Sequence, residues 1–352
     1  MTGRHTVLDP ADLAEMHRSF AGALGQVAAR PHQQADGAAA RRALLEAGWL
    51  DALAAAPVDA TRSLFALQGR LVCETAALDD VVAAELAASW PALAGVDAAV
   101  AYPMPEPGGP RAEHPEPGRR LLLGAHADAT HLVWPTIDTD GRTLLVLFER
   151  AGEDGEPVRG IDPDFGLRLL SKQPSEPVDR LDGPEAADAW ARAVARGRGA
   201  LAHQLAAGSR ALLHLARDYA LERRQFGHTI GSYQAVRHRL AETLAEVAGA
   251  EAAADAADIA RTALAGATAK LLAGRAAAAA GRHCLQVFGA IGFTMEHPFH
   301  RHFRRNLVLD SLLDDRNRLA AAIGADLRHS GAIPPHAELD DPVPHPLPGG
   351  PR

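Results

Sequence analysis

The chain has 352 residues, a net charge of −8, and 47% hydrophobic and 23% charged residues, a balance that argues against a general nucleic-acid-binding role. No apolar run reaches the length of a transmembrane helix, and MTGRHTVLDPADL lacks the apolar stretch of a secretory signal, so we expect a cytoplasmic protein without membrane contact. Two cysteines, Cys73 and Cys284, are too few for a disulfide framework or a cysteine-rich metal site, and 75 alanines favour a mostly helical chain.

The first part of the chain, residues 1–96, is predicted to be an abbreviated helical domain, because leucines recur there at helical spacing. Residues 103–120 are rich in Pro and Gly and exclude a helix. Short apolar runs follow, separated by turn signals such as Asp140-Gly141. We expect a small β domain over residues 97–181, with strands at Leu121–Leu123, His131–Ile137, Thr143–Phe148 and Leu167–Leu170.

The remainder predicts a helical bundle at residues 182–329. Asp182 to Glu185 is typical of a helix start, and one apolar face then recurs every three or four residues from Leu201 to Tyr219. Ser232 is expected to cap a second helix that runs to about residue 263, and further helices are expected over about 268–288 and 299–327. Long helices with short breaks predict an antiparallel four-helix bundle, and the Pro-rich tail, residues 330–352, is expected to be disordered.

Two segments of the bundle combine a helix end with Gly-rich backbone. They are Arg223-Arg224-Gln225-Phe226-Gly227, followed later by Gln234, and Gln286-Val287-Phe288-Gly289-Ala290-Ile291-Gly292. Exposed backbone N–H groups beside a guanidinium can bind an anion. Taken alone, each segment is equally typical of a capped corner of a bundle.

Taken together, the two segments resemble the acyl-CoA dehydrogenase family, which carries Arg-x-x-Phe-Gly…Gln after its first C-terminal helix and Gln-x-x-Gly-Gly-x-Gly after its third. The resemblance implies a mainly α fold with a small middle β domain, in which an N-terminal helical domain and a C-terminal four-helix bundle flank the β domain. It also implies FAD at a subunit interface and an acyl-CoA thioester as substrate. By this resemblance Arg223, Gln225, Phe226, Gln286 and Gly289 contact the FAD of a neighbouring subunit. The alternative for Arg223 is a surface ion pair with Glu222.

The catalytic base of the family is a carboxylate, and its usual position falls at Leu313, which cannot accept a proton. Asp310 and Asp314 lie nearby, but a shift of one residue turns a helical side chain by about 100°. Some relatives carry the base early in the first bundle helix, where residues 194–199 hold no acid. Arg198 in that segment aligns with an arginine of the family.

The β domain departs from the family pattern, since the flavin-stacking Trp and the hydroxyl near the flavin are replaced by Leu122-Leu123-Gly124-Ala125. Trp134 lies on a later strand and is expected in the core. The chain therefore resembles a base-lacking subunit of the bacterial heterotetrameric dehydrogenases, including those acting on steroid-derived thioesters, in which two homologous chains form an α2β2 assembly.

Other interpretations remain open at this point. The chain could be a self-sufficient, homo-oligomeric flavoenzyme that uses Asp310 or Asp314 as its base, or a dehydrogenase-like scaffold without redox activity. His297, His300 and His302 are irregularly spaced and lack a complete ligand set, so no metal site is expected. Arg301, Arg304 and Arg305 form a basic strip, which is either a solvated helix face or a contact to CoA phosphates or to acids of a neighbouring chain.

Overall fold

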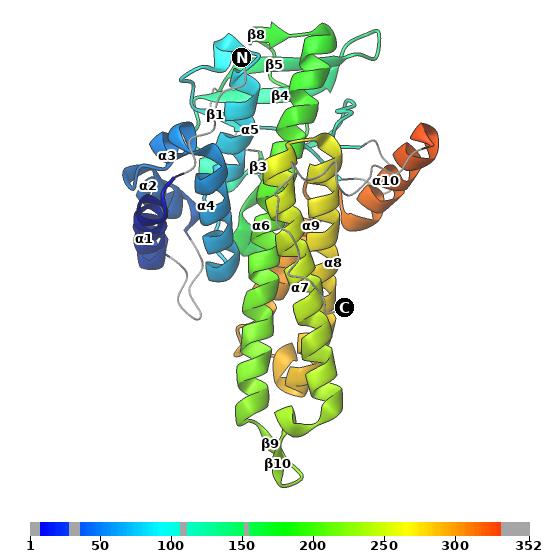
Figure 1. Ribbon diagram of the computed structural model, residues 1–352. Coiled ribbons are helices and arrows are strands. Elements are labelled where there is room, and N and C mark those ends of the chain that lie inside the picture. The colour runs from blue at the N-terminus through cyan, green and yellow to red at the C-terminus, as the bar shows by residue number, and fades with distance from the viewer. Residues whose placement is uncertain (1–7, 28–35, 106–110, 151–154, 332–352) are drawn as a thin grey trace, which may run out of the picture.

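The computed structural model describes residues 8–27, 36–105, 111–150 and 155–331. Five helices lead the chain, followed by a β region and then by a group of long helices (Figure 1). This order confirms the predicted fold class, whereas the domain boundaries at residues 96, 181 and 329 stay predictions. Nearly all of the expected disordered tail, residues 330–352, lies outside the described residues. Within the described residues, no helix is both long enough and apolar enough to cross a membrane.

The N-terminal helices pack around one apolar core that continues into the bundle. Their bounds are α1 Pro10–Val27, α2 Gly37–Glu46, α3 Trp49–Ala55, α4 Pro57–Leu71 and α5 Ala77–Ala87. Helix α4 crosses the first bundle helix at Gly69, where a Cβ atom would lie 2.2 Å from the carbonyl oxygen of Gln204. A larger residue at Gly69 would push the two backbones apart, so the close crossing requires glycine.

The β region consists of two four-stranded sheets. One sheet has the order β1-β4-β5-β8 and the other the order β2-β3-β7-β6, with β1 parallel to β4 and the other neighbours antiparallel. The bounds are β1 Ala98–Val100, β2 Tyr102–Pro103, β3 Arg120–Leu123, β4 His131–Ile137, β5 Thr143–Glu149, β6 Glu156–Pro157, β7 Leu167–Leu170 and β8 Pro177–Leu181. The four predicted strands are confirmed to within one residue, and β1, β2, β6 and β8 were missed. Trp134 is buried, as expected.

Four long helices form the C-terminal bundle, and a fifth packs against it (Figure 1). The bounds are α6 Gly183–Glu222, α7 Gln234–Ala260, α8 Ala263–Phe288, α9 Phe299–Ser311 and α10 Arg316–Ser330. The predicted cap of α7 and the predicted start of α8 were wrong. Ser232 does not cap α7, because its hydroxyl donates to the Thr229 carbonyl. Helix α8 begins earlier than predicted, because the Thr262 side chain caps it by accepting from the Ala265 N–H.

The predicted last helix, about 299–327, is two helices in the structure. Leu313 and Asp314 take positive φ angles of 53° and 75°, which end α9 and turn the chain into α10. The buried Lys270 ammonium donates to the carbonyl oxygens of Asp310 and Asp314 across this break. Burial lowers the pKa of Lys270 to about 8, against the raising effect of Asp310. One buried cation thus satisfies carbonyl groups that the ends of the helices leave without partners.

A buried polar cluster joins the N-terminal helices to the β region through the short turn η2, Gly124–His126. His126 lies between the carboxylates of Asp79, at 2.9 Å, and Asp97, at 2.8 Å. The Arg41 guanidinium binds Asp80 and also contacts His126. Burial alone would lower the pKa of His126, but the hydrogen bonds to Asp79 and Asp97 outweigh burial and raise the pKa to about 9.

We predict that stability falls as the pH rises from 6.5 to above 9. The folded pKa of His126 lies above its ordinary value of 6.5, so its contribution is complete below pH 6.5 and is lost as the pH passes through about 9. The loss is up to about 3 kcal/mol. Urea unfolding at a series of pH values measures it. The variant His126→Asn should flatten this dependence, whereas His238→Asn, at an exposed residue, should keep it; equal slopes in both variants would contradict the assignment.

Candidate functional site

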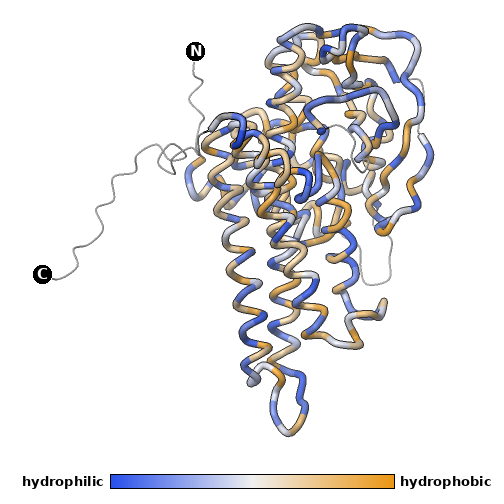
Figure 2. Tube along the Cα trace, turned by 90° about the vertical axis from the view of Figure 1, so that its right-hand side faces the viewer, coloured by the Kyte–Doolittle hydropathy of each residue, from blue (hydrophilic) through white to orange (hydrophobic). Residues whose placement is uncertain are grey.

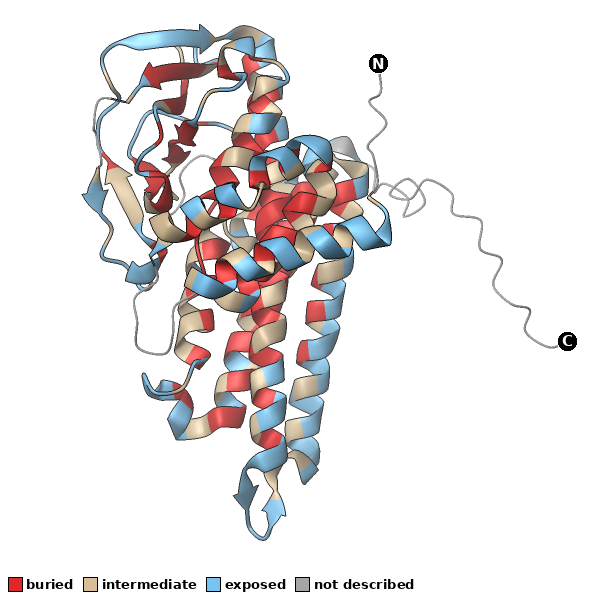
Figure 3. Ribbon diagram, turned by 90° about the vertical axis from the view of Figure 1, so that its left-hand side faces the viewer, coloured by how far each residue is buried: buried red, intermediate tan, exposed pale blue. Residues whose placement is uncertain are grey.

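The two predicted FAD-contacting segments lie at the same end of the bundle. Helices α6 and α8 run in the same direction, so their C-terminal ends lie side by side (Figure 1). The ring of Tyr219 meets the ring of Phe288 edge-on, with the centroids 5.4 Å apart. We call this end, residues 217–239 and 282–304, the bundle tip. Its outermost part, the hairpin of β9 (Arg224–Gln225) and β10 (His228–Thr229), is exposed (Figure 3).

The hairpin presents Phe226 to the outside. Phe226 has a φ of 52° and is 90% exposed. The left-handed backbone is unfavourable for a bulky residue, and exposure to water is unfavourable for a large apolar ring. The hairpin is held in place by the Tyr233 hydroxyl, which donates to the Gln225 carbonyl at 3.1 Å. It is also held by the Ile230 N–H, which donates to the Arg223 carbonyl. A rigid, exposed Phe is typical of a surface that is covered in an assembly.

Arg223 ends α6 and has an exposed guanidinium. Within the described parts of the chain, that guanidinium has no hydrogen-bond or ion-pair partner, so the alternative pair with Glu222 is not formed. An exposed, unpaired guanidinium is suited to a bidentate contact with a diphosphate. Gln225, the next predicted contact, is also exposed.

The second segment follows α8. Gln286 is exposed on the last turn of the helix, and Gly289 takes a φ of 63° directly after it. A Cβ atom on Gly289 would meet nothing within 4 Å, so the backbone is open to an approaching ligand. Gln286 and Gly289 therefore offer an amide and an accessible turn of backbone beside the hairpin. The exposed groups of both segments fit the outer part of a dinucleotide.

The two alternative positions for the catalytic base converge in space. Leu313 is 4% exposed. Gly197 belongs to the segment 194–199, and a Cβ atom added to Gly197 would lie 2.7 Å from the Cδ1 atom of Leu313. Leu78 and Val82 of α5 pack at the same point. The structure thus brings both positions to one place, which is filled by apolar side chains.

The two aspartates near this place are engaged in hydrogen bonds and ion pairs. Asp310 is 5% exposed and binds the backbone N–H and the guanidinium of Arg316. Asp314 is also 5% exposed and binds the Arg198 guanidinium at 2.7 Å and the Ala112 N–H at 2.9 Å. Both carboxylates thus hold the α9–α10 break in place.

Arg198 is the centre of this buried network. Its side chain is 1% exposed, and its guanidinium donates to the Leu313 carbonyl, to Asp314 and to Glu113. Burial raises the pKa of Glu113, but the contact with Arg198 outweighs burial and leaves that pKa below its ordinary value. Arg198 is therefore part of the buried interior and not a solvated surface charge.

The packing at Gly197 gives a testable expectation. In Gly197→Ala the new methyl group would collide with Leu313, so we expect a loss of about 1–3 kcal/mol in the free energy of unfolding. The matched control is Gly199→Ala on the same helix, where a Cβ meets nothing within 4 Å. It should be neutral or stabilise by up to about 1 kcal/mol. Urea unfolding distinguishes the two, and equal effects would show that Leu313 does not fill this space.

The segment aligned with the flavin-facing strand of the family is covered by protein. Leu122, Leu123 and Ala125 are buried, and α2 packs on η2 so closely that a Cβ on Gly37 would lie 3.0 Å from the Cβ of Ala125. The aligned segment therefore has no open face for a flavin ring, and these residues do not fit that group.

The histidines expected not to bind metal are held separately. The His297 ring lies 4.2 Å from that of Phe288, His300 contacts the His297 carbonyl, and His302 is buried.

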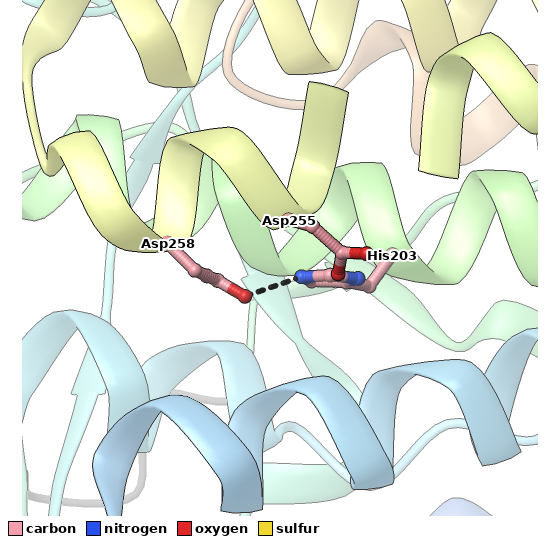
Figure 4. Close-up of side chains that lie close together, drawn as sticks. All are labelled: His203, Asp255 and Asp258. Atoms are coloured by element: carbon pink, nitrogen blue, oxygen red, sulfur yellow. Dashed lines mark hydrogen bonds and ion pairs between the residues drawn. The ribbon is translucent and has the colours of Figure 1, made fainter. Parts of the chain in front are cut away.

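A different group, His203, Asp255 and Asp258, has side-chain atoms spaced like the ligands of a metal ion (Figure 4). There His203 binds Asp258 at 2.9 Å. The guanidinium groups of Arg62 and Arg196 balance the charge of the two carboxylates. This group is a charge-balanced ion-pair cluster.

Part of the chain matches a known protein family. Residues 188–312 match the family model described as acyl-CoA dehydrogenase, C-terminal domain. The chain is 37% identical to acyl-CoA dehydrogenase IpdE2 of Mycobacterium tuberculosis over 150 residues, which are 43% of this chain and 44% of that protein. It spans less than half the length of the curated relatives it matches.

Several solved structures are similar over nearly the whole chain, and two of them are described below. The Tcur3481–Tcur3483 steroid ACAD has a TM-score of 0.74 at 22% identity, covering 91% of this chain and 98% of that one. The ChsE4–ChsE5 complex of Mycobacterium tuberculosis has a TM-score of 0.72 at 20% identity, covering 92% of this chain and 98% of that one. At this identity the likeness establishes the fold.

Proposed function

We propose that this chain takes part in the FAD-dependent α,β-dehydrogenation of an acyl-CoA thioester. Its residues 188–312 match the C-terminal domain of acyl-CoA dehydrogenases, and the chain shares the fold of a solved protein of that kind. Within this reaction it is the auxiliary subunit, which lends its bundle tip to the FAD site of a homologous partner in an α2β2 assembly. Bound FAD would supply the hydride acceptor. The partner would supply the carboxylate that removes the α-proton.

The observation that carries the auxiliary role is the closed base position. Leu313 packs against Gly197 and α5, at the point where both alternative base positions meet. Neither Asp310 nor Asp314 faces that point as a free carboxylate, because hydrogen-bond donors and arginines engage both. A base must lie within hydrogen-bond reach of the proton it removes, and this packing leaves no room for an α-carbon.

The bundle tip supports the complementary half of the proposal. Arg223, Gln225, Phe226, Gln286 and Gly289 are together and accessible there. Arg223 would bind the diphosphate, the exposed Phe226 ring would pack against the dinucleotide, and Gln286 and Gly289 would contact its outer part. By contrast, in the segment aligned with the flavin-facing strand Leu122, Leu123 and Ala125 are buried, and α2 packs against Ala125.

The proposal extends to the substrate, the assembly and the compartment. A steroid-derived thioester is the first substrate to test, because one similar structure is described as a steroid ACAD. A heteromeric assembly is proposed because another is described as a ChsE4–ChsE5 complex. Cys73 and Cys284 are free, buried thiols, consistent with the reducing cytoplasm that we propose.

The test is to purify the chain alone and together with a co-expressed, full-length homologue encoded beside it, and to measure bound flavin. We expect flavin only in the co-purified complex. Stoichiometric FAD and turnover with the chain alone would contradict the proposal in favour of a self-sufficient, homo-oligomeric enzyme with an unconventional base. Flavin in neither preparation would contradict it in favour of a scaffold.

A further inference from the structure

The hairpin at the bundle tip has an unusual residue in its turn. Gln225 pairs directly with His228, so the turn consists of Phe226 and Gly227 alone. Both residues take positive φ angles, 52° and 84°, as a type I′ turn requires. Asn and Gly are favoured in such a turn, whereas a bulky residue such as Phe is strained there. The shape of the turn therefore depends on contacts from outside the hairpin.

Tyr233 also occupies a position that its residue type does not favour. It is the N-cap residue of α7, yet its side chain caps none of the first N–H groups of that helix, as Ser, Thr, Asp or Asn would do. The Tyr233 hydroxyl instead donates to the Gln225 carbonyl at 3.1 Å, and the residue is only 37% exposed. Phe226 and Tyr233 thus both depart from local preference, and departures of this kind are expected at functional positions.

The Gln225 carbonyl belongs to the peptide group that joins Gln225 to Phe226. Because a peptide group is planar, fixing its oxygen restricts the backbone on both sides, and with it the direction of the two side chains. The base of the hairpin is held by the Ile230 N–H, which donates to the Arg223 carbonyl at 2.8 Å. A two-stranded hairpin is marginal on its own in water, and this one extends beyond the helices at the lower end of the bundle (Figure 2). These contacts therefore set its position.

We infer that Tyr233 is a positioning residue for the FAD contact: its hydroxyl holds the peptide group between Gln225 and Phe226 so that both side chains face the dinucleotide. The inference rests on the proposed function. Tyr233 acts through the hairpin and does not touch FAD itself. Its effect on FAD should therefore disappear when the two side chains that it places are removed, and its effect on the hairpin should be measurable in the chain alone.

The first test compares two Tyr→Phe variants in the assembled complex by equilibrium dialysis of FAD. Tyr233→Phe removes the hydroxyl and keeps the ring, so FAD should bind about 3–10-fold more weakly, as expected for the loss of one neutral hydrogen bond. Tyr219→Phe is the control at the same end of the bundle. Within the described residues the Tyr219 hydroxyl makes no hydrogen bond and its ring packs on Phe288, so this variant should bind FAD as the parent does. Equal affinities for the two variants would overturn the inference.

A double-mutant cycle separates positioning from direct contact. The background Gln225→Ala/Phe226→Asn removes both side chains that would contact FAD, while Asn suits the left-handed backbone of the turn. In this background Tyr233→Phe should leave FAD affinity unchanged, because no placed side chain remains. An undiminished loss in this background would show that Tyr233 touches FAD directly, and would contradict the positioning role.

Amide hydrogen exchange in the chain alone tests the hairpin without FAD. The Ile230 N–H closes the base of the hairpin, so its exchange in Tyr233→Phe should be at least about threefold faster than in the parent and in Tyr219→Phe. Unchanged exchange would overturn the inference. A flavin-free complex together with faster exchange would contradict the proposed function and leave the contact between Tyr233 and the hairpin standing. A flavin-containing complex in which Tyr233→Phe changes neither FAD affinity nor exchange would contradict the positioning role alone.

Discussion

Replacement of Arg198 by methionine is expected to lower the free energy of unfolding by about 3–5 kcal/mol. The guanidinium is 1% exposed and binds Asp314, Glu113 and the Leu313 carbonyl. Methionine fills much of the same volume but leaves Asp314 and Glu113 with only their longer contacts to Arg318, at 3.4 Å, and to Arg111, at 3.8 Å. Breaking a buried pair in this way is costly, because the remaining charges have lost most of their solvent together with their shortest ion-pair contact. Urea unfolding at pH 7 measures the loss.

The control for this prediction is Arg142→Met. Arg142 also binds an aspartate, Asp140, but the two side chains are 68% and 64% exposed. Exposed pairs contribute about 0–1 kcal/mol, so this variant should unfold almost as the parent does. Similar losses in both variants would mean that Arg198 is not the support of the α9–α10 break.

Replacement of Arg223 by alanine is expected to weaken FAD retention by the assembled complex about 10–100-fold. A hydrogen bond to a charged group contributes about 1.5–3 kcal/mol, which corresponds to that range of affinity. Because the Arg223 guanidinium is exposed and unpaired within the described residues, its removal should not change the stability of the chain itself. Equilibrium dialysis of FAD against the purified complex measures the affinity.

The matched control is Arg217→Ala at the same end of the bundle. Arg217 is 56% exposed but already paired with Asp218, so its loss should leave FAD affinity within about twofold of the parent. Equal FAD affinity for Arg223→Ala and the parent would refute the assigned contact. Equal losses in both variants would point to the general charge of the tip rather than to Arg223.

The bundle could be predicted from sequence because its signals are local. The apolar repeat from Leu201 to Tyr219 specifies one helical face, and Gly289 marks the end of α8. The break at residues 312–315 was missed because it depends on distant partners. Lys270 and Arg198, from two other helices, stabilise left-handed backbone at Leu313 and Asp314 that neither residue type would favour alone.

The closed base position was predicted only in part. The sequence indicates that Leu313 cannot accept a proton, but not that it packs on Gly197 and α5. Glu113 was missed altogether, since it lies in the Pro/Gly-rich segment 103–120, whose backbone has no periodic pattern. Its role appears only when tertiary structure brings it to Arg198.

The ratio of FAD to protein in the assembled complex tests the central claim most directly. If this chain completes its partner's site and has none of its own, each pair of chains should bind one FAD. The ratio follows from flavin absorbance after denaturation and from the amount of each chain. One FAD per pair is the predicted result, whereas two per pair would contradict the account, because this chain would then hold a flavin of its own.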